Sequence, residues 1–242
     1  MIDSDPILAK VRKLLTLAED PAATPHEAEA CTAKAIQLMA DYGIDQALLA
    51  HDGPARHSVG DRVIRFEAPY ARDKCALAST IAHRTRCRCV IIQKGHAVSL
   101  HIFGVEVDLM CVEILLTSLL LQGTRELGRT PIPWGAHTAA YRRTWWAGFS
   151  AAISRRLAET EHQSVGAADR GRSSDEMSAS LVLADRSHEA ESAMNAHYPS
   201  LRNAGRRRLS GGGSRDGYAS GQKADLSRGR SIGQQEGREL TG

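Results

Sequence analysis

The fold is decided by KVRKLLTLAED, residues 10–20, and by the PAATPHEAEACTAKAIQLMADYGID that follows, residues 21–45. In the first stretch, apolar side chains such as Val11 and Leu15 recur every three or four residues. That spacing places them on one face of a helix, which we expect over residues 5–18. The other face carries three basic residues, Lys10, Arg12 and Lys13.

A second helix is predicted directly after the Pro/Thr-rich turn. Thr24 and Glu27 have the spacing of a capping box, in which each side chain hydrogen-bonds the other residue's backbone N–H. Pro25 suits the first helical position because the N–H it lacks would have no partner there. Gly43 is placed to end this helix, so we expect a short antiparallel hairpin.

This hairpin resembles a known family. The run K-V-R-K-L-L-x-L-A, then H-E-A-E-A, then K-A-x-x-L-M-A-x-Y-G-I-D, from Lys10 to Asp45, resembles domain-of-unknown-function family 2786. A looser resemblance continues at Tyr141–Phe149, which is similar to a Y-R-R-x-[FW]-x-x-G-F helix in members of that family. The resemblance implies a bacterial or phage cytoplasmic protein of no agreed activity, so it assigns no catalytic residue here.

Length and composition limit the class of protein. A chain of 242 residues with 42% hydrophobic residues can bury one sizeable core. Its start lacks the basic and apolar regions of a signal peptide, and its best apolar run, Leu109–Leu121, is interrupted by Glu113. We therefore expect a cytoplasmic protein with no membrane partner, whose five cysteines stay reduced.

Downstream periodicity predicts an α+β fold in which a small antiparallel sheet packs against long helices. We divide the chain into a helical hairpin domain over 1–50, a mixed helix/sheet domain over 61–163 and a weakly structured, basic Gly/Arg-rich region over 164–242. The expected strands are Arg62–Glu67, a hairpin of Cys87–Gln93 with Ala97–Phe103, and Leu181–Leu183. The expected helices are Tyr70–Arg84, Gly104–Arg129, His137–Glu161, His188–His197 and Gly217–Ser227.

Charge is concentrated near the C-terminus. The whole chain carries only +3, but Pro199 to the end holds nine Arg or Lys against four Asp or Glu, with ten of the 21 glycines. We expect a flexible, cationic tail around Arg206, Arg207 and Arg208. Such a tail would bind phosphates without sequence specificity.

Cys87 and Cys89 are the best candidates for metal binding. Residues two apart in a strand point to the same face, so the two thiols could converge. Zinc needs four ligands, and no second pair of cysteines or histidines completes the set. Buried structural thiols are the favoured interpretation, and we expect no cofactor. The sequence also lacks a Walker loop and a G-x-S-x-G motif, so it supports neither nucleotide hydrolysis nor serine hydrolase chemistry.

The helix that begins near His137 offers the main functional hypothesis. Its apolar stripe includes Trp145 and Trp146, and Arg142 points in the direction of that stripe, whereas Arg143 points elsewhere. Arg142 could form an internal salt bridge, with Glu106 or Glu113 as its partner. Alternatively it could face a ligand, with the tryptophan rings stacking on single-stranded nucleic acid.

We therefore expect a non-enzymatic, nucleic-acid-associated accessory protein. The residues expected to contact nucleic acid are Lys10, Arg12, Lys13, Arg142, Arg143, Trp145, Trp146, Arg206, Arg207 and Arg208. Two alternatives stay open. One is a metal-dependent enzyme that uses Cys87, Cys89 and a nearby histidine. The other is a protein-interaction module in which the helical hairpin docks another protein.

Overall fold

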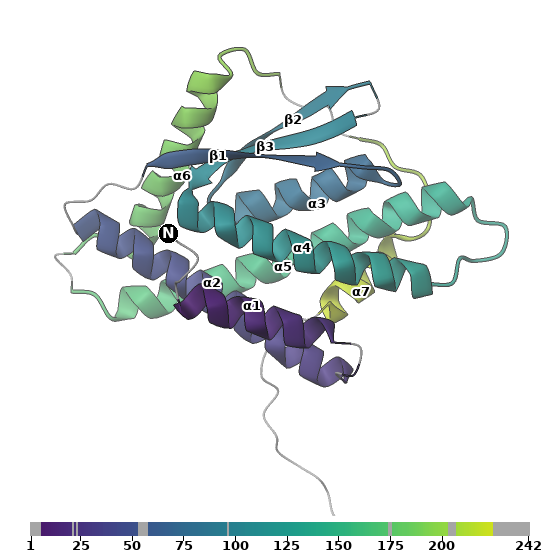
Figure 1. Ribbon diagram of the computed structural model, residues 1–242, viewed down its shortest axis with the longest axis horizontal. Helices are drawn as coiled ribbons and strands as arrows, with labels where there is room; N and C mark the ends of the chain where they lie inside the picture. The colour runs from purple at the N-terminus through teal and green to yellow at the C-terminus, as the bar shows by residue number, and fades with distance from the viewer. Residues whose placement is uncertain are drawn as a thin grey trace, which may run out of the picture.

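A computed structural model describes residues 6–20, 22, 24–52, 58–95, 97–173, 176–202 and 207–224 (Figure 1). The helices are α1 (Pro6–Glu19), α2 (Pro25–Asp52), α3 (Ala71–Arg84), α4 (Glu106–Arg129), α5 (Thr138–Arg170), α6 (Ala179–His197) and α7 (Ser214–Lys223). The strands are β1 (Val59–Phe66), β2 (Arg88–Lys94) and β3 (Ala97–Val105). The chain is α+β, as predicted. Arg206 and residues 225–242 lie outside the described residues.

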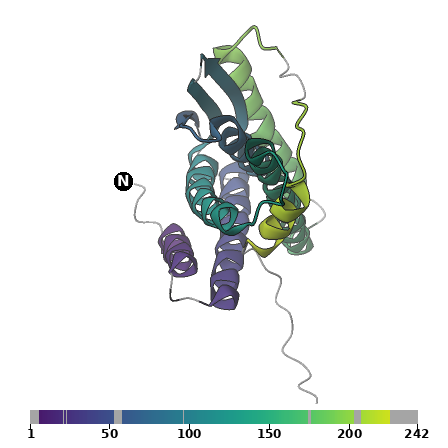
Figure 2. The same cartoon turned by 90° about the vertical axis from the view of Figure 1, so that its right-hand side faces the viewer.

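The three strands form one antiparallel sheet in the order β1-β3-β2. The predicted β2–β3 hairpin is confirmed. Leu100 and Ile102 of β3 face the core, which α3 and α4 cover. Because side chains alternate along a strand, His101 and Phe103 lie on the other face, where α6 packs (Figures 1 and 2).

One hydrophobic core joins the N-terminal hairpin to the rest of the molecule. Val11 and Leu15 of α1 and Met39 of α2 belong to the same buried cluster as Leu100 of the sheet and Phe149 of α5. The apolar stripes that predicted the hairpin are therefore covered by the protein itself.

The start of α2 follows the prediction and its end does not. Thr24 N–H donates to the Glu27 carboxylate, and Glu27 N–H donates to Thr24 Oγ1, so the capping box is confirmed. Gly43, however, does not end the helix, which continues to Asp52. A side chain at Gly43 would lie 2.5 Å from Arg86 Nη2, and the Gly43 carbonyl accepts a hydrogen bond from Arg186. This glycine makes room for two arginines.

A row of glycines fixes α7 against α5. Gly213, Gly217 and Gly221 are spaced four apart, and each lies against the α5 backbone. A Cβ at Gly217 would lie 1.9 Å from the Trp145 carbonyl oxygen. Gly148 of α5 lies against the α7 backbone at Ser214 and Tyr218 in return, so both helices use glycine for this close approach.

The C-terminal third contains more helix than predicted. Residues 164–170, the start of the region that we expected to be weakly structured, extend α5, and Ser164 is buried where its Oγ accepts a hydrogen bond from Gln37. The strand expected at Leu181–Leu183 is wrong, because these residues lie in α6. Val182 and Leu183 pack against α2 at Ile44, so tertiary contact decides the state of this short apolar run.

Helix α4 is the central core helix that its sequence predicts. It is also the one helix in the described part of the chain that is long and apolar enough to cross a membrane. Leu109, Val112 and Leu119 are buried in the core, which accounts for that apolar character.

Candidate functional site

Trp145 and Trp146 are not available for stacking on nucleic acid. Their exposed fractions are 0% and 1%, and both rings pack with Phe149 inside the core. Gly217 of α7 lies against the Trp145 backbone, and Gly123 of α4 lies against the Trp146 ring. The expectation that these rings face a ligand is therefore wrong.

Within the described residues, Arg142 forms no salt bridge with Glu106 or Glu113, which was one of the two roles considered for it. Glu106 and Glu113 both pair with Arg62 of β1 instead, at 2.5 and 3.4 Å. Arg142 is half-buried, and its Nε lacks a hydrogen-bond partner among the described residues. A guanidinium with open hydrogen-bonding capacity thus remains near the start of α5.

Two of the expected arginines converge on one buried carboxylate. Asp73, in the first turn of α3, is 6% exposed. Its Oδ1 lies 2.9 Å from Arg207 Nη1, and its Oδ2 lies 4.0 Å from Arg143 Nε. One negative charge faces two positive ones, so the site keeps a net positive charge, to which the adjacent exposed Arg208 adds.

A fully exposed tryptophan lies at the same end of the molecule. Trp134 is in the loop of residues 130–137 between α4 and α5, and among the described residues it is the most exposed large hydrophobic side chain. Pro131 and Pro133 on either side of Ile132 restrict the backbone of this loop. Figure 1 shows the loop, the start of α5 and the start of α3 at one end of the molecule.

Sequence reasoning missed Trp134. The signal was the P-x-P-W-G pattern, which puts an aromatic ring in a stiff loop rather than on an amphipathic face. We call Trp134, Arg142, Arg143, Arg207 and Arg208 together the basic end.

The charges of α1 form a different surface. Lys10 and Lys13 are exposed and Arg12 is half-buried. Helix α1 packs against α2 and α4, and Figure 2 shows it well separated from α7 and from the chain that leads into α7. Lys10, Arg12 and Lys13 therefore do not share one surface with Arg207 and Arg208.

Cys87 lies just before β2 and is buried, whereas Cys89 lies in β2 and is half-buried. Cys87 Sγ approaches the Thr85 carbonyl, and Cys89 Sγ lies 3.3 Å from Ser79 Oγ and 3.9 Å from His83 Nε2. Burial raises the pKa of both thiols. No group of three His, Cys, Asp or Glu side chains that could hold a metal occurs within the described ranges.

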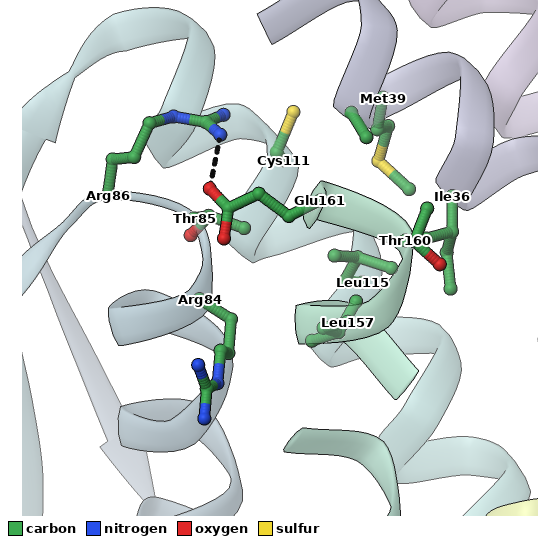
Figure 3. A pocket seen from close by; sticks show the side chains of 11 residues that line it. Ile36, Met39, Arg84, Thr85, Arg86, Cys111, Leu115, Leu157, Thr160 and Glu161 are labelled. Carbon is green, nitrogen blue, oxygen red and sulfur yellow. Dashed lines mark hydrogen bonds and ion pairs between the residues drawn. The ribbon is translucent and has the colours of Figure 1, made fainter. Parts of the chain in front are cut away.

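A buried cluster of charges joins three helices and the turn that follows α3. Asp108 of α4 pairs with Arg86 at 2.7 Å and with Arg186 of α6 at 3.3 Å, and Arg86 also reaches Glu161 of α5 at 3.1 Å. Burial lowers the pKa of Arg86, but the charge of Asp108 and its hydrogen bond outweigh this and raise it. Figure 3 shows the Arg86–Glu161 pair beside a cavity of about 30 Å³, which has room for about one water molecule. This cluster fits a structural role.

His101 has a comparable structural arrangement on the outer face of the sheet. Its Nε2 lies 2.9 Å from Asp61 Oδ2, and its Nδ1 lies 2.8 Å from the Tyr198 hydroxyl. The His197 ring contacts the imidazole at its edge. Both ring nitrogens are occupied, so His101 holds the end of α6 against the sheet.

Comparison with known proteins finds a family match for the helical hairpin. Residues 7–46 match the family described as a protein of unknown function (DUF2786). This match confirms the resemblance predicted from the hairpin, and it covers α1 and most of α2. The looser resemblance at Tyr141–Phe149 lies outside the matched residues. No curated protein and no solved structure matches this chain.

Proposed function

We propose that this protein is a non-enzymatic accessory protein that binds nucleic acid through its basic end. The observation that carries the proposal is the fully exposed Trp134 at the end of the molecule where Arg143 and Arg207 converge. Trp134 takes the role that we first expected of Trp145 and Trp146.

The chemical groups of the basic end are suited to binding single-stranded nucleic acid. Guanidinium groups bind phosphate oxygens and release condensed counterions, which supplies affinity without sequence specificity. An exposed aromatic ring stacks on an unpaired base, and this contact is worth about 1–3 kcal/mol. A duplex offers phosphates but no free base face, so the tryptophan favours single-stranded DNA or RNA.

The binding test measures the fluorescence anisotropy of labelled single- and double-stranded DNA and RNA as salt is raised from about 50 mM. We expect the logarithm of the binding constant to fall linearly with the logarithm of the salt concentration. The double variant Arg143→Gln/Arg208→Gln should reduce the slope on duplex DNA by about two, because each lost phosphate contact contributes about 0.9. A wild-type protein that binds none of these probes at the lowest salt would refute the proposal.

A matched double variant on the other basic surface serves as the control. Lys10→Gln/Lys13→Gln removes the same formal charge from exposed positions of α1, away from the basic end. Its affinity and salt slope should stay close to those of the wild type. Equal losses in both double variants would indicate attraction by net charge instead of a located surface.

Trp134→Ala tests the stacking contact by itself. It should weaken single-strand binding by about 5- to 150-fold, which corresponds to 1–3 kcal/mol, and leave duplex binding nearly unchanged. The ring is fully exposed, so the variant should fold as the wild type does. An unchanged affinity for single strands would remove Trp134 from the interface.

The two alternative functions receive less support. Leu14 and Leu38 of the hairpin pack against the common core, which leaves less of the apolar stripe for docking another protein. Within the described residues, Cys87 and Cys89 belong to no group of three His, Cys, Asp or Glu side chains that could hold a metal ion. Stoichiometric zinc that survives dialysis would favour the metal-dependent enzyme over the nucleic-acid-binding protein.

A further inference from the structure

A groove of about 400 Å³ runs between α3 and α5. Its walls are mostly small side chains, including Ala76 of α3 and Ala147 and Ala151 of α5. Because these side chains are small, they leave open a space that larger side chains would fill. The volume lies within the range of pockets that take small organic ligands.

Ser150, in the wall of this groove, has an unmet hydrogen-bonding requirement. Its side chain is 8% exposed, and its Oγ lacks a hydrogen-bond partner among the described residues. A buried hydroxyl without a partner is costly, and most such groups in folded proteins are satisfied. A bound molecule in the groove could supply the missing partner.

Arg207 gives the groove its charge. Arg207 lines the groove, and its Nη1 pairs with Asp73, which fixes the position of its guanidinium. A guanidinium carries five donors, and among the described residues Asp73 is the ion-pair partner of Arg207, so other N–H groups of this side chain can bind a second anion. Asp73 also lines the groove, and Arg143, which lies outside the lining, offsets part of the negative charge of that carboxylate because its Nε is 4.0 Å from Asp73 Oδ2.

We propose that the groove binds a small organic anion, a carboxylate or a phosphate ester. Its acidic group pairs with Arg207, its compact body lies against Ala147 and Ala151, and a polar atom on that body hydrogen-bonds Ser150. This site goes beyond the proposed nucleic-acid contact, because filling the groove requires neither Trp134 nor Arg208.

Thermal-shift and calorimetric titrations with benzoate and phenyl phosphate, at up to about 10 mM, test the proposal because even millimolar binding is visible there. Both anions should raise the melting temperature. Their neutral counterparts, benzamide and phenol, should not, and inorganic phosphate should do so less than phenyl phosphate. No stabilisation by either organic anion would overturn the proposal.

Variants locate the binding. Ala151→Leu places a larger side chain in the groove at an exposed helical position and should abolish the response, whereas Ala167→Leu, an exposed alanine of α5 outside the groove, should keep it. Arg207→Gln should weaken binding by about tenfold or more through loss of the charge-assisted contact. A response that survives in Ala151→Leu would place the anions elsewhere and overturn the proposal.

Trp134→Ala separates this inference from nucleic-acid binding. The variant should bind phenyl phosphate as the wild type does, even where its single-strand binding is lost. A response that disappears in Trp134→Ala and persists in Ala151→Leu would mean that the probe stacks on the exposed ring, which refutes the groove and leaves the nucleic-acid proposal intact.

Discussion

Asp108 is the residue on which the buried charge cluster depends. Its carboxylate is 1% exposed and faces both Arg86 and Arg186. Asp108→Asn keeps the shape of the side chain but leaves two buried guanidinium groups with reduced compensation. We expect a loss of about 3–5 kcal/mol in the free energy of unfolding, measured by urea denaturation.

The surface pair of Arg62 with Glu113 supplies the control for this prediction. Glu113 is exposed, and its carboxylate lies 3.4 Å from Arg62 Nε. Glu113→Gln should change the free energy of unfolding by less than about 1 kcal/mol, because solvent screens an exposed pair. Similar losses in the two variants would show that burial of Asp108 has no special effect.

The thiols provide a test of reactivity at the same scale. Burial raises the pKa of Cys75 and of Cys111 to about 12, whereas an ordinary thiol titrates near pH 8.5. At pH 8 the thiolate fraction of each is then only about 10⁻⁴. In the native protein we expect fast reaction with a thiol reagent at the half-buried Cys31 alone, and reaction of all five thiols in denaturant.

Single serine variants identify the reacting thiol. Cys31→Ser should remove the fast phase, and Cys89→Ser should not. The rates of the buried thiols should rise steadily with pH above 8, because their thiolate fraction is still increasing there. Fast reaction at Cys89 would contradict the protonated state and revive the enzyme hypothesis.

At the scale of elements, the contact between α5 and α7 reverses the usual effect of glycine in a helix. Replacing glycine by alanine inside a helix normally adds about 0.5–1 kcal/mol of stability. At Gly217 the new methyl group would meet the Trp145 carbonyl at 1.9 Å, so Gly217→Ala should cost about 1–3 kcal/mol in the free energy of unfolding.

Gly128 of α4 is the matched control, since nothing lies within 4 Å of a Cβ built there. Gly128→Ala should therefore leave stability unchanged or raise it by up to about 1 kcal/mol. Both values come from chemical denaturation curves. Stabilisation by Gly217→Ala would mean that α7 does not pack closely against α5.

The difference between local and long-range contacts explains how well the sequence predicts the helices and strands. The α2 start was predictable because Thr24 and Glu27 hydrogen-bond within one turn. Gly43 was not, because its role depends on Arg86 and Arg186, which are remote in the sequence. The run at Leu181–Leu183 is too short for its periodicity to separate strand from helix.

The candidate site was less predictable than the fold, for a related reason. Periodicity correctly placed Trp145 and Trp146 on the apolar stripe, but it could not show that α7 and α4 cover that stripe. Asp73 had no sequence signal linking it to Arg143 and Arg207. The fold brings together three segments that are distant in the chain.

At the scale of the whole molecule, the shared core predicts one cooperative unfolding transition. The chain pattern suggested a separate hairpin domain over 1–50, yet Leu15 of α1 and Ile102 of β3 belong to the same buried cluster. Tryptophan fluorescence, which reports on Trp145 and Trp146, and far-ultraviolet circular dichroism should therefore give coincident urea transitions.

Two core variants, one in the hairpin and one in the sheet, test this prediction further. Leu15→Ala and Ile102→Ala each remove buried methyl groups, and each should lower the free energy of unfolding by about 2–5 kcal/mol. Because both residues stabilise the same unit, each variant should move the fluorescence and dichroism curves together. If Leu15→Ala instead produced a first transition seen only by circular dichroism, the hairpin would unfold on its own, and the core that α1 shares with the sheet would contribute little to its stability.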